Sequence, residues 1–306
     1  MNEPAQRGHL IHFTPLRYPG GKAKLAEYVK SLMKQNRLLD GEYVEPYAGG
    51  AAIALELLFH EYASRIHIND VSKPVHAFWK SVLSHTEEFC RLVINTPLTV
   101  VEWDRQKQIL DKPTGQSVVG LGFATFFLNR TNRSGILNGG IIGGRDQTGP
   151  WKIDARYNAR ELVRRIESVA RMSGRIRLTR QDALKFLKAG VSRWPKETLI
   201  YLDPPYYAKG RDLYYDFYEE KDHVSVAKFV TSAITEQRWI VSYDNVKPIR
   251  DLYIDARHVV YDIGYSARKA TQGSEVMFFC NGLQVPPLVG PVRITESHPN
   301  LFRRPA

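Results

Sequence analysis

The chain has 306 residues, 43% of them hydrophobic and 25% charged, an ordinary globular composition long enough for one large core or a core and a satellite domain. Its two cysteines, Cys90 and Cys280, are too few for a disulfide framework or a multi-cysteine zinc site, so we expect a reducing compartment and no metal. The start, MNEPAQRGHLIHF, does not read as a signal peptide, and the most apolar run, SVVGLGFATFFL, is too short to span a bilayer. We therefore expect a soluble cytoplasmic protein.

The positive charge is concentrated in one segment. The whole chain carries a net +11, and from Asn129 to Arg180 eleven arginines and one lysine stand against four acidic residues, a net +8. Arginine gathered in this way suits contacts with phosphates and base edges. A solvated helix face explains the same pattern, because RYNARELVRRIESVARMSGR places basic residues among apolar ones at helical spacing. Composition alone favours a nucleic-acid partner only slightly.

Candidate strands and helices alternate along the chain. The expected helices are 22–34, 49–62, 183–190 and 222–237, and the expected strands are 42–47, 65–70, 175–182, 198–206 and 238–245. This alternation predicts an α/β fold with a Rossmann-like, doubly wound, mostly parallel sheet. Two further strands, 258–267 and 275–282, are joined by a short polar link and predict an antiparallel hairpin at the edge of a seven-stranded sheet.

The alternation is interrupted between residues 73 and 155. That region holds a helical stretch at 74–94 and a Gly-rich polar stretch at 129–150, and a mainly helical substrate-recognition insert is one interpretation of it. An ordinary structural excursion is the other. The tail, 286–306, contains several prolines and is expected to be irregular.

Polar residues at the strand ends are expected to converge, because ligands of open α/β sheets bind outside the carboxyl ends of the strands. In EPYAGGAAIALELL a strand leads through Gly49 and Gly50 directly into a helix, and glycine lets a backbone approach a ligand closely. Asp70, 21 residues after Gly49, is placed to accept the hydroxyls of a ribose. Each feature has a structural alternative, because the glycines could form a simple tight turn and Asp70 could cap the following helix. Together they predict a nucleoside ligand without phosphates.

The segment TPLRYPGGK does not fit the phosphate loop of nucleotide-binding proteins. Tyr18 is placed to lie against a ligand ring, and Lys22 to bind a ligand carboxylate. A simple turn before a surface helix is the alternative, which spacing alone favours.

The segment LIYLDPPYYAKG ends a buried strand with an acid and two rigid residues. Because proline fixes φ and donates no backbone hydrogen bond, Asp203 and a diproline carbonyl form a side-by-side pair of acceptors. Such a pair suits an exocyclic amine with two N–H donors, with Tyr206 offering a flat face to the ring. Holding both N–H groups exposes the nitrogen lone pair to an electrophilic methyl group placed in line.

The chain resembles the D12 class of S-adenosylmethionine-dependent DNA adenine-N6 methyltransferases, the Dam-like group. The resemblance rests on segments that occur in the family's order: PLRYPGGK, EPYAGGAA, Asp70, FFLNRTNRSG, QDALKFL, LIYLDPPYY and EVMFF. The resemblance implies transfer of a methyl group from S-adenosyl-L-methionine to N6 of a flipped-out adenine at specific sites in double-stranded DNA. It implies a cofactor-binding catalytic domain formed by 1–72 and 156–285, with 73–155 as the target-recognition insert.

The resemblance also assigns roles to individual residues. The residues that it implies for cofactor binding are Tyr18, Lys22, Glu45, Pro46, Ala48, Gly49, Gly50, Asp70, Asp182 and Asp203. The implied catalytic residues are Asp203, Pro204, Pro205 and Tyr206. The implied DNA-binding residues are Asn129, Arg130, Arg133, Ser134 and Gly135. A helix cap at Asn129 and a solvated Arg133 are the structural alternatives. His223 is expected at a helix start. Many relatives carry glycine where this chain has Ala51, and a methyl group there is expected to tighten the cofactor pocket.

Two other functions stay open at this point. Methylation of RNA or of a different exocyclic amine uses the same acceptor pair, and a catalytically silent DNA-binding relative keeps the basic segment. The sequence leaves open the DNA site and whether the enzyme serves restriction–modification, a phage or another regulatory system. We expect a monomer or weak dimer acting on bacterial nucleoid DNA, with no membrane partner.

Overall fold

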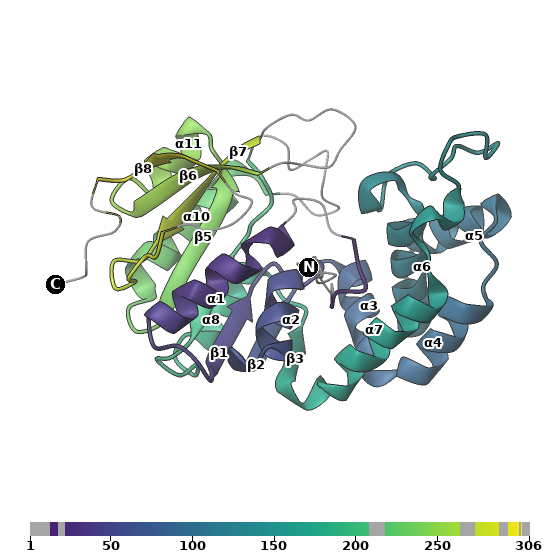
Figure 1. Ribbon diagram of the computed structural model, residues 1–306, viewed down its shortest axis with the longest axis horizontal. Coiled ribbons are helices and arrows are strands. Elements are labelled where there is room, and N and C mark those ends of the chain that lie inside the picture. Colours follow the sequence, from purple (N-terminus) through teal and green to yellow (C-terminus); the bar gives the residue numbers. More distant parts are fainter. Residues whose placement is uncertain are drawn as a thin grey trace, which may run out of the picture.

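The computed structural model describes residues 13–17, 22–207, 218–263, 273–287, 293–299 and 301. Figure 1 shows two bodies side by side, an α/β body built on one twisted sheet and a body made of helices. The α/β body contains both the earliest helices of the chain and most of its later half, so it is assembled from segments far apart in sequence.

Within the described residues, the sheet has eight strands in the spatial order β3-β2-β1-β4-β5-β7-β6-β8. Their bounds are β1 (Gly41–Glu45), β2 (Ala63–Asn69), β3 (Ile176–Thr179), β4 (Leu199–Leu202), β5 (Arg238–Asp244), β6 (Arg257–Ile263), β7 (Gly273–Phe279) and β8 (Arg293–Ser297). The first five strands in this order pair in parallel, and the last three pair antiparallel. The prediction of a mostly parallel α/β sheet is confirmed.

The predicted count of seven strands is wrong for the described residues, and so is the position of the hairpin. β6 and β7 do pair antiparallel, but β7 lies inside the sheet against β5, and β8 covers the outer side of β6. β8 comes from the segment that was expected to be irregular. Its sequence, RITES, has one apolar residue, and contacts such as the ion pair between Arg250 and Glu296 hold it in place. Because such contacts are tertiary, the local pattern does not reveal this strand.

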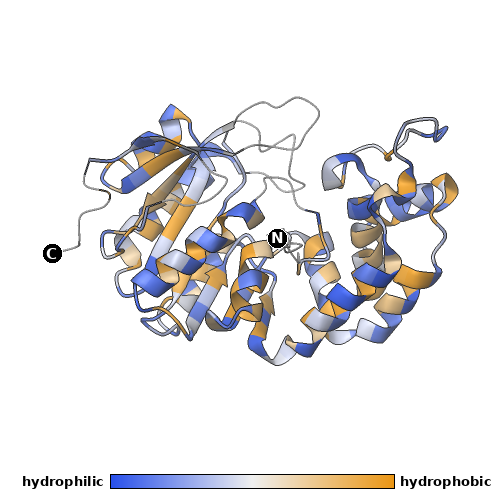
Figure 2. Ribbon diagram, in the orientation of Figure 1, coloured by the Kyte–Doolittle hydropathy of each residue, from blue (hydrophilic) through white to orange (hydrophobic). Residues whose placement is uncertain are grey.

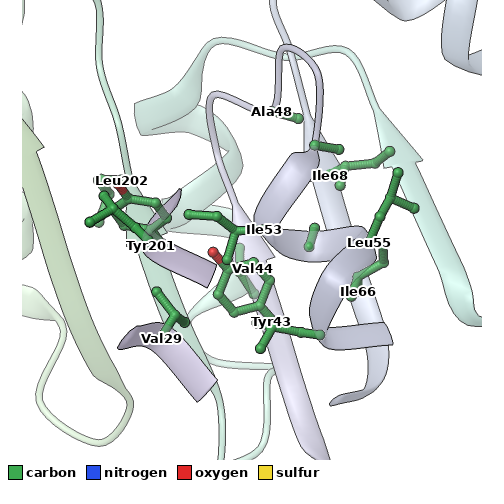
Figure 3. Packing of buried hydrophobic residues seen from close by; sticks show 14 of the residues in the cluster. Val29, Tyr43, Val44, Ala48, Ile53, Leu55, Ile66, Ile68, Tyr201 and Leu202 are labelled. Carbon is green, nitrogen blue, oxygen red and sulfur yellow. The ribbon is translucent and has the colours of Figure 1, made fainter. Parts of the chain in front are cut away.

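Helices flank the sheet and follow the predicted pattern. Their bounds are η1 (Lys22–Leu25), α1 (Ala26–Gln35), α2 (Ala52–Phe59), α8 (Ala183–Gly190), α10 (Glu220–Ala233) and α11 (Lys247–Leu252). All four residues of β4 are buried, as expected for a central strand covered on both faces. Figure 3 shows Tyr43 and Val44 of β1 packed with side chains from both α1 and α2. This core fixes the carboxyl ends of the parallel strands at one edge of the body.

The second body consists of helices from the middle of the chain. Their bounds are α3 (Lys73–Ser84), α4 (Thr86–Asn95), α5 (Val100–Asp111), α6 (Val118–Thr131) and α7 (Ala159–Arg171), with the short turns η2 (Arg133–Gly135), η3 (Ile153–Arg156) and η4 (Ser173–Arg175). α6 is the central helix, in contact with α3, α4 and α5. α7 packs against α3 and α4, so the helical body continues past Ala155 to Arg171.

Helix α7 shows that part of the arginine-rich segment is a solvated helix face. Leu162, Ile166 and Val169 are buried along one side of the helix, while Arg164 and Arg171 are exposed on the other. Figure 2 shows hydrophilic and hydrophobic residues recurring along the helices of this body. The charge of this segment therefore follows partly from helical amphipathicity.

The apolar run SVVGLGFATFFL forms the start of α6 and packs inside the helical body. No helix in the described part of the chain is both long enough and apolar enough to cross a membrane. Gly122 brings α6 close to α3, because a Cβ atom at this position would lie 2.5 Å from Ser81 Oγ and 2.6 Å from Ala77 O. The absence of a side chain at Gly122 is thus a requirement of the packing.

We expect Gly122→Ala to reduce the free energy of unfolding by about 1–3 kcal/mol, because the added methyl group forces α3 and α6 apart. Gly174→Ala is the matched control, since a Cβ atom there would meet nothing within 4 Å. Urea unfolding of both variants measures the difference. Equal stability of Gly122→Ala and the wild type would show that the helices separate without cost.

Candidate functional site

The ends of five parallel strands bring the predicted site residues to one edge of the sheet. In spatial order, β3, β2, β1 and β4 are followed by Asp182, Asp70, the turn 46–50 and Asp203, and β5 ends at Asp244. Neighbouring parallel strands place their carboxyl ends side by side, so the acidic residues flank the glycine turn on both sides. The edge is therefore rich in hydrogen-bond acceptors.

Asp70 and the glycine turn are joined directly. The Gly49 N–H donates to Asp70 Oδ2 at 2.9 Å, and the Ser72 N–H donates to Oδ1 at 2.9 Å. Gly49 has a φ of +46°, a left-handed conformation that glycine adopts readily. The two bonds fix the direction of a carboxylate that is only half-buried. Asp70 is therefore oriented to accept further donors.

Ala51 also has a left-handed backbone, with a φ of +45°. For an L residue with a Cβ atom this conformation costs roughly 1–2 kcal/mol. Its methyl group is 1% exposed and belongs to the hydrophobic cluster, which compensates part of that cost.

Glu45, at the end of β1, is buried, as are Pro46 and Ala48 in the turn. Glu45 Oε1 accepts hydrogen bonds from Tyr43 OH at 3.0 Å and from the Ala54 N–H in the first turn of α2 at 3.1 Å. Burial raises the pKa of Glu45 to about 8, although these two hydrogen bonds lower it, and the nearby Asp203 raises it further. A proton on Oε2 disturbs neither bond, so Glu45 supports the start of α2 in its neutral form.

Lys22 connects the N-terminal part of the chain with Asp203. Its Nζ lies 3.0 Å from Asp203 Oδ1 and 2.6 Å from Glu275 Oε2, and it donates to Ser242 Oγ at 3.3 Å. Ser242 Oγ in turn donates to Asp203 Oδ1 at 2.7 Å and is bonded to the Tyr201 hydroxyl at 2.9 Å. These contacts join η1, β4, β5 and β7 in one buried network.

Glu275 is a central residue of this network that the sequence does not predict, as are Ser242 and Tyr201. It is 1% exposed and accepts hydrogen bonds from Tyr206 OH and, at 2.9 Å, from Tyr261 OH, as well as the ion pair with Lys22. A single acid in the apolar strand EVMFF was the available signal, because a buried carboxylate needs partners. Through these bonds Glu275 fixes Tyr206 and Lys22 relative to each other.

The network carries two carboxylates against one ammonium group, a net charge of −1 when all three groups are ionised. Burial raises the pKa of Asp203 and Glu275 raises it further, while Lys22 and the hydrogen bond from Ser242 oppose the shift. Although burial lowers the pKa of Lys22, the two carboxylates outweigh it and raise that pKa well above its ordinary value. Both Lys22 and Ser242 engage Oδ1 of Asp203, and no hydrogen bond from the described residues reaches Oδ2.

The segment after Asp203 is held at several points. Tyr206 is 6% exposed, and Lys22 Nζ lies 5.7 Å from the centre of its ring. The Tyr207 N–H donates to Asp244 Oδ1 at 2.9 Å. Pro204 is buried and Pro205 half-buried. The DPPY segment is therefore a rigid rim at the end of β4.

Asn129 and Arg130, which are predicted to contact DNA, both make hydrogen bonds within the protein. The Asn129 side-chain amide accepts from the Arg17 N–H at 2.7 Å and donates to Arg17 O at 2.6 Å, and Arg130 Nε donates to Pro15 O at 2.7 Å. They hold residues 13–17, which we call the strap, against α6. Thr14 Oγ1 of the strap donates to Gly50 O at 2.6 Å, so the strap joins the helical body to the glycine turn.

The other predicted residues are distributed as follows. Arg133 and Ser134 are exposed, and Gly135 packs against the strap. Asp182 is exposed and caps α8, accepting from the Lys185 N–H at 2.9 Å. Tyr18 lies outside the described residues. His223 is buried in the first turn of α10, where Nδ1 lies 3.0 Å from Tyr243 OH, consistent with a structural role.

Comparisons with known proteins support one family. The model of the D12 class N6 adenine-specific DNA methyltransferases matches residues 18–106, which include Lys22, the glycine turn and Asp70 but not Asp203. No curated protein matches the chain. Among solved structures, the crystal structure of protein LPL1258 from Legionella pneumophila str. Philadelphia 1, family-model DUF519, is 13% identical over 89% of this chain and 88% of that chain, with a TM-score of 0.34.

The raised pKa of Glu45 predicts a pH dependence of stability. The folded protein holds a proton that the unfolded chain releases above its ordinary pKa of 4.5, so the stabilisation is complete below that pH and is lost as the pH rises through about 8. Between about pH 5 and about pH 8, the wild type should lose on the order of 3 kcal/mol more stability than Glu45→Gln, which cannot ionise. Urea unfolding of both proteins across this pH range measures the difference. If the free energies of unfolding of the wild type and Glu45→Gln change with pH in parallel, the raised pKa of Glu45 is contradicted.

The buried network predicts that Lys22→Met is strongly destabilising. Asp203 and Glu275 would then face each other without a counter-charge, which costs about 3–5 kcal/mol. Adding Glu275→Gln should restore part of the loss, because one charge is removed. Lys34→Met, at an exposed position of α1, is the control for loss of a lysine. Thermal and urea unfolding compare the variants, and a loss no greater than that of the control would refute the coupling.

Proposed function

We propose that the protein is a site-specific DNA methyltransferase that transfers a methyl group from S-adenosyl-L-methionine to N6 of a flipped-out adenine in double-stranded DNA. One observation carries this proposal. The ion pair between Lys22 and Asp203, 3.0 Å long, connects the segment matched by the adenine methyltransferase family with the DPPY segment outside the match. The family's cofactor-binding part and an amine-binding acid thus share one edge of the sheet.

The residues at this edge fit S-adenosyl-L-methionine. Asp70 is oriented by two backbone N–H groups and suits the ribose hydroxyls, and the buried turn at Ala48, Gly49 and Gly50 offers close backbone approach. Asp182, on the neighbouring strand end, suits the cofactor's adenine. Lys22 has its contacts with Asp203, Glu275 and Ser242, so we assign it to positioning Asp203 and not to binding the cofactor carboxylate.

Asp203 is proposed to hold the target amine through Oδ2. Oδ1 accepts from both Lys22 and Ser242, which leaves the other oxygen for an incoming N–H donor. The backbone of Pro204 and Pro205 supplies a rigid carbonyl acceptor beside it. S-adenosyl-L-methionine, when bound, supplies the methyl group on a positively charged sulfur. With both N–H groups held, the amine nitrogen directs its lone pair at that group.

Charge and proton balance support Asp203 as the proton acceptor. With the methyl donor bound, the nitrogen would form a bond to the methyl carbon as the carbon–sulfur bond breaks, and the positive charge would pass from sulfur to nitrogen. The network's net charge of −1 stabilises that cation in both positions. The nitrogen then releases a proton to Asp203, whose pKa is raised by burial and by Glu275. The total charge of the buried site therefore stays the same throughout the reaction.

Tyr206 is proposed to stack against the flipped adenine. Its hydroxyl is held by Glu275 and Lys22 lies over its ring, so its orientation is set before the base arrives. Stacking on an aromatic ring contributes about 1–3 kcal/mol per base, comparable with the few kcal/mol needed to unstack a base from a duplex.

We propose that the helical body recognises the DNA. Arg133 and Ser134, exposed after α6, are the predicted contact residues that solvent reaches. We propose that residues 1–72 and 156–285 form the catalytic domain, except that α7, which lies within the second range, packs with the helical body. The proposal includes a monomer or weak dimer in a bacterial cytoplasm.

We expect Asp203→Ala to lower methyl transfer from labelled S-adenosyl-L-methionine to unmethylated duplex DNA by about 10²–10⁴-fold. Binding of the same duplex should be unchanged, because Lys22 keeps its ion pair with Glu275. Asp251→Ala, at an exposed acid paired with Lys247 on α11, is the control and should retain activity.

The outcomes separate the competing functions. Transfer to RNA alone would assign the protein to RNA methylation, and tight duplex binding by the wild type without any transfer would identify a silent DNA-binding protein. Sequencing that detects modified bases in DNA from expressing cells identifies the methylated base and its site.

A further inference from the structure

A cavity of about 460 Å³ lies between η3 and the start of α7, in the helical body and away from Asp203. Its charged lining consists of Arg130, Arg156, Arg165, Asp154 and Glu161. The proposed methyl transfer uses none of these side chains. We call this cavity the arginine pocket.

The positive charge of the arginine pocket is not balanced by its acids. Glu161 is shared by two arginines, with Arg164 at 2.6 Å and Arg165 at 3.1 Å. Arg156 is exposed and has no ion pair with any described residue. Arg130 is 8% exposed and donates to a neutral group, Pro15 O. A nearly buried guanidinium without a carboxylate partner is unusual, because burying an unpaired charge is costly.

The arginines also act on each other. Burial lowers the pKa of Arg130 to about 9, and the positive charges of Arg165 and Arg17 lower it further. Burial likewise lowers the pKa of Arg17, and the positive charge of Arg156 lowers it further. An anion in the arginine pocket would relieve this repulsion. The planar guanidinium forks match the oxygens of a phosphate group better than a lysine ammonium does.

We propose that the arginine pocket binds a phosphate group and that its occupant is a backbone phosphate of the DNA. The identity of the occupant rests on the proposed function, whereas the pocket's preference for phosphate does not. A flat ring lies at its border, because the Arg156 guanidinium sits 5.9 Å from the ring centre of Trp151, which is 65% exposed. An exposed aromatic ring beside a phosphate site suits a nucleic-acid strand.

The position of the arginine pocket connects it with the cofactor side. Arg130 donates to Pro15 O and Arg165 Nη1 to Thr14 O at 3.5 Å, so two of its arginines also hold the strap. Thr14 Oγ1 then bonds Gly50 in the glycine turn. A phosphate bound here fixes the side chains that hold the strap.

The test compares Arg156→Gln with Arg171→Gln. Both remove one exposed arginine, but Arg171 lies at the other end of α7, outside the pocket lining. Fluorescence anisotropy measures binding of an unmethylated duplex over a range of salt concentrations. We expect Arg156→Gln to weaken binding and to reduce the slope of log K against log salt by about 1, the value of one phosphate contact. Arg171→Gln should keep the wild-type slope.

A second measurement uses inorganic phosphate alone. Phosphate should raise the thermal unfolding temperature of the wild type and of Arg171→Gln more than that of Arg156→Gln. If phosphate stabilises the variants in this way but Arg156→Gln keeps the wild-type salt dependence of DNA binding, the pocket binds a free phosphate compound and the DNA assignment is overturned. No difference between the variants in either measurement would overturn the pocket itself. A phosphate response in a protein that binds no DNA would refute the proposed function while the pocket stands.

Discussion

The ammonium group of Lys22, shared between Asp203 and Glu275, joins three segments that are far apart in the sequence. It brings η1 against the ends of β4 and β7, and it orients the carboxylate at the mouth of the DPPY segment. Because Glu275 also holds the hydroxyl groups of Tyr206 and Tyr261, the position of the tyrosine ring depends on the same ion pair. The geometry proposed for the amine follows from this one buried contact.

The strap has the corresponding role between the two bodies. Its backbone is held by Asn129 and Arg130 of α6, and its Thr14 side chain reaches Gly50. Five residues therefore link the helices that we propose to recognise DNA with the turn that we propose to line the cofactor. Bonds to backbone groups make this link insensitive to most side chains of the strap.

The sequence predicted the parallel sheet, the helices around it and the strand-end residues, because hydrophobic periodicity and the rule for strand ends are local or topological. It did not predict β8, Glu275 as the centre of the network, or the internal roles of Asn129 and Arg130. Each of these depends on a partner more than ten residues away in sequence. Residue type alone does not reveal that an arginine such as Arg130 bonds a backbone carbonyl within the protein.

The two sites carry charges of opposite sign, and the strap lies between them. The network around Asp203 has a net negative charge when its three charged groups are ionised, and the arginine pocket has more arginines than acids. Methyl transfer to DNA joins an anionic polymer with a cationic methyl donor. We infer that each site attracts the partner of opposite charge. Keeping the acids at the sheet edge and the arginines behind the strap separates the two attractions.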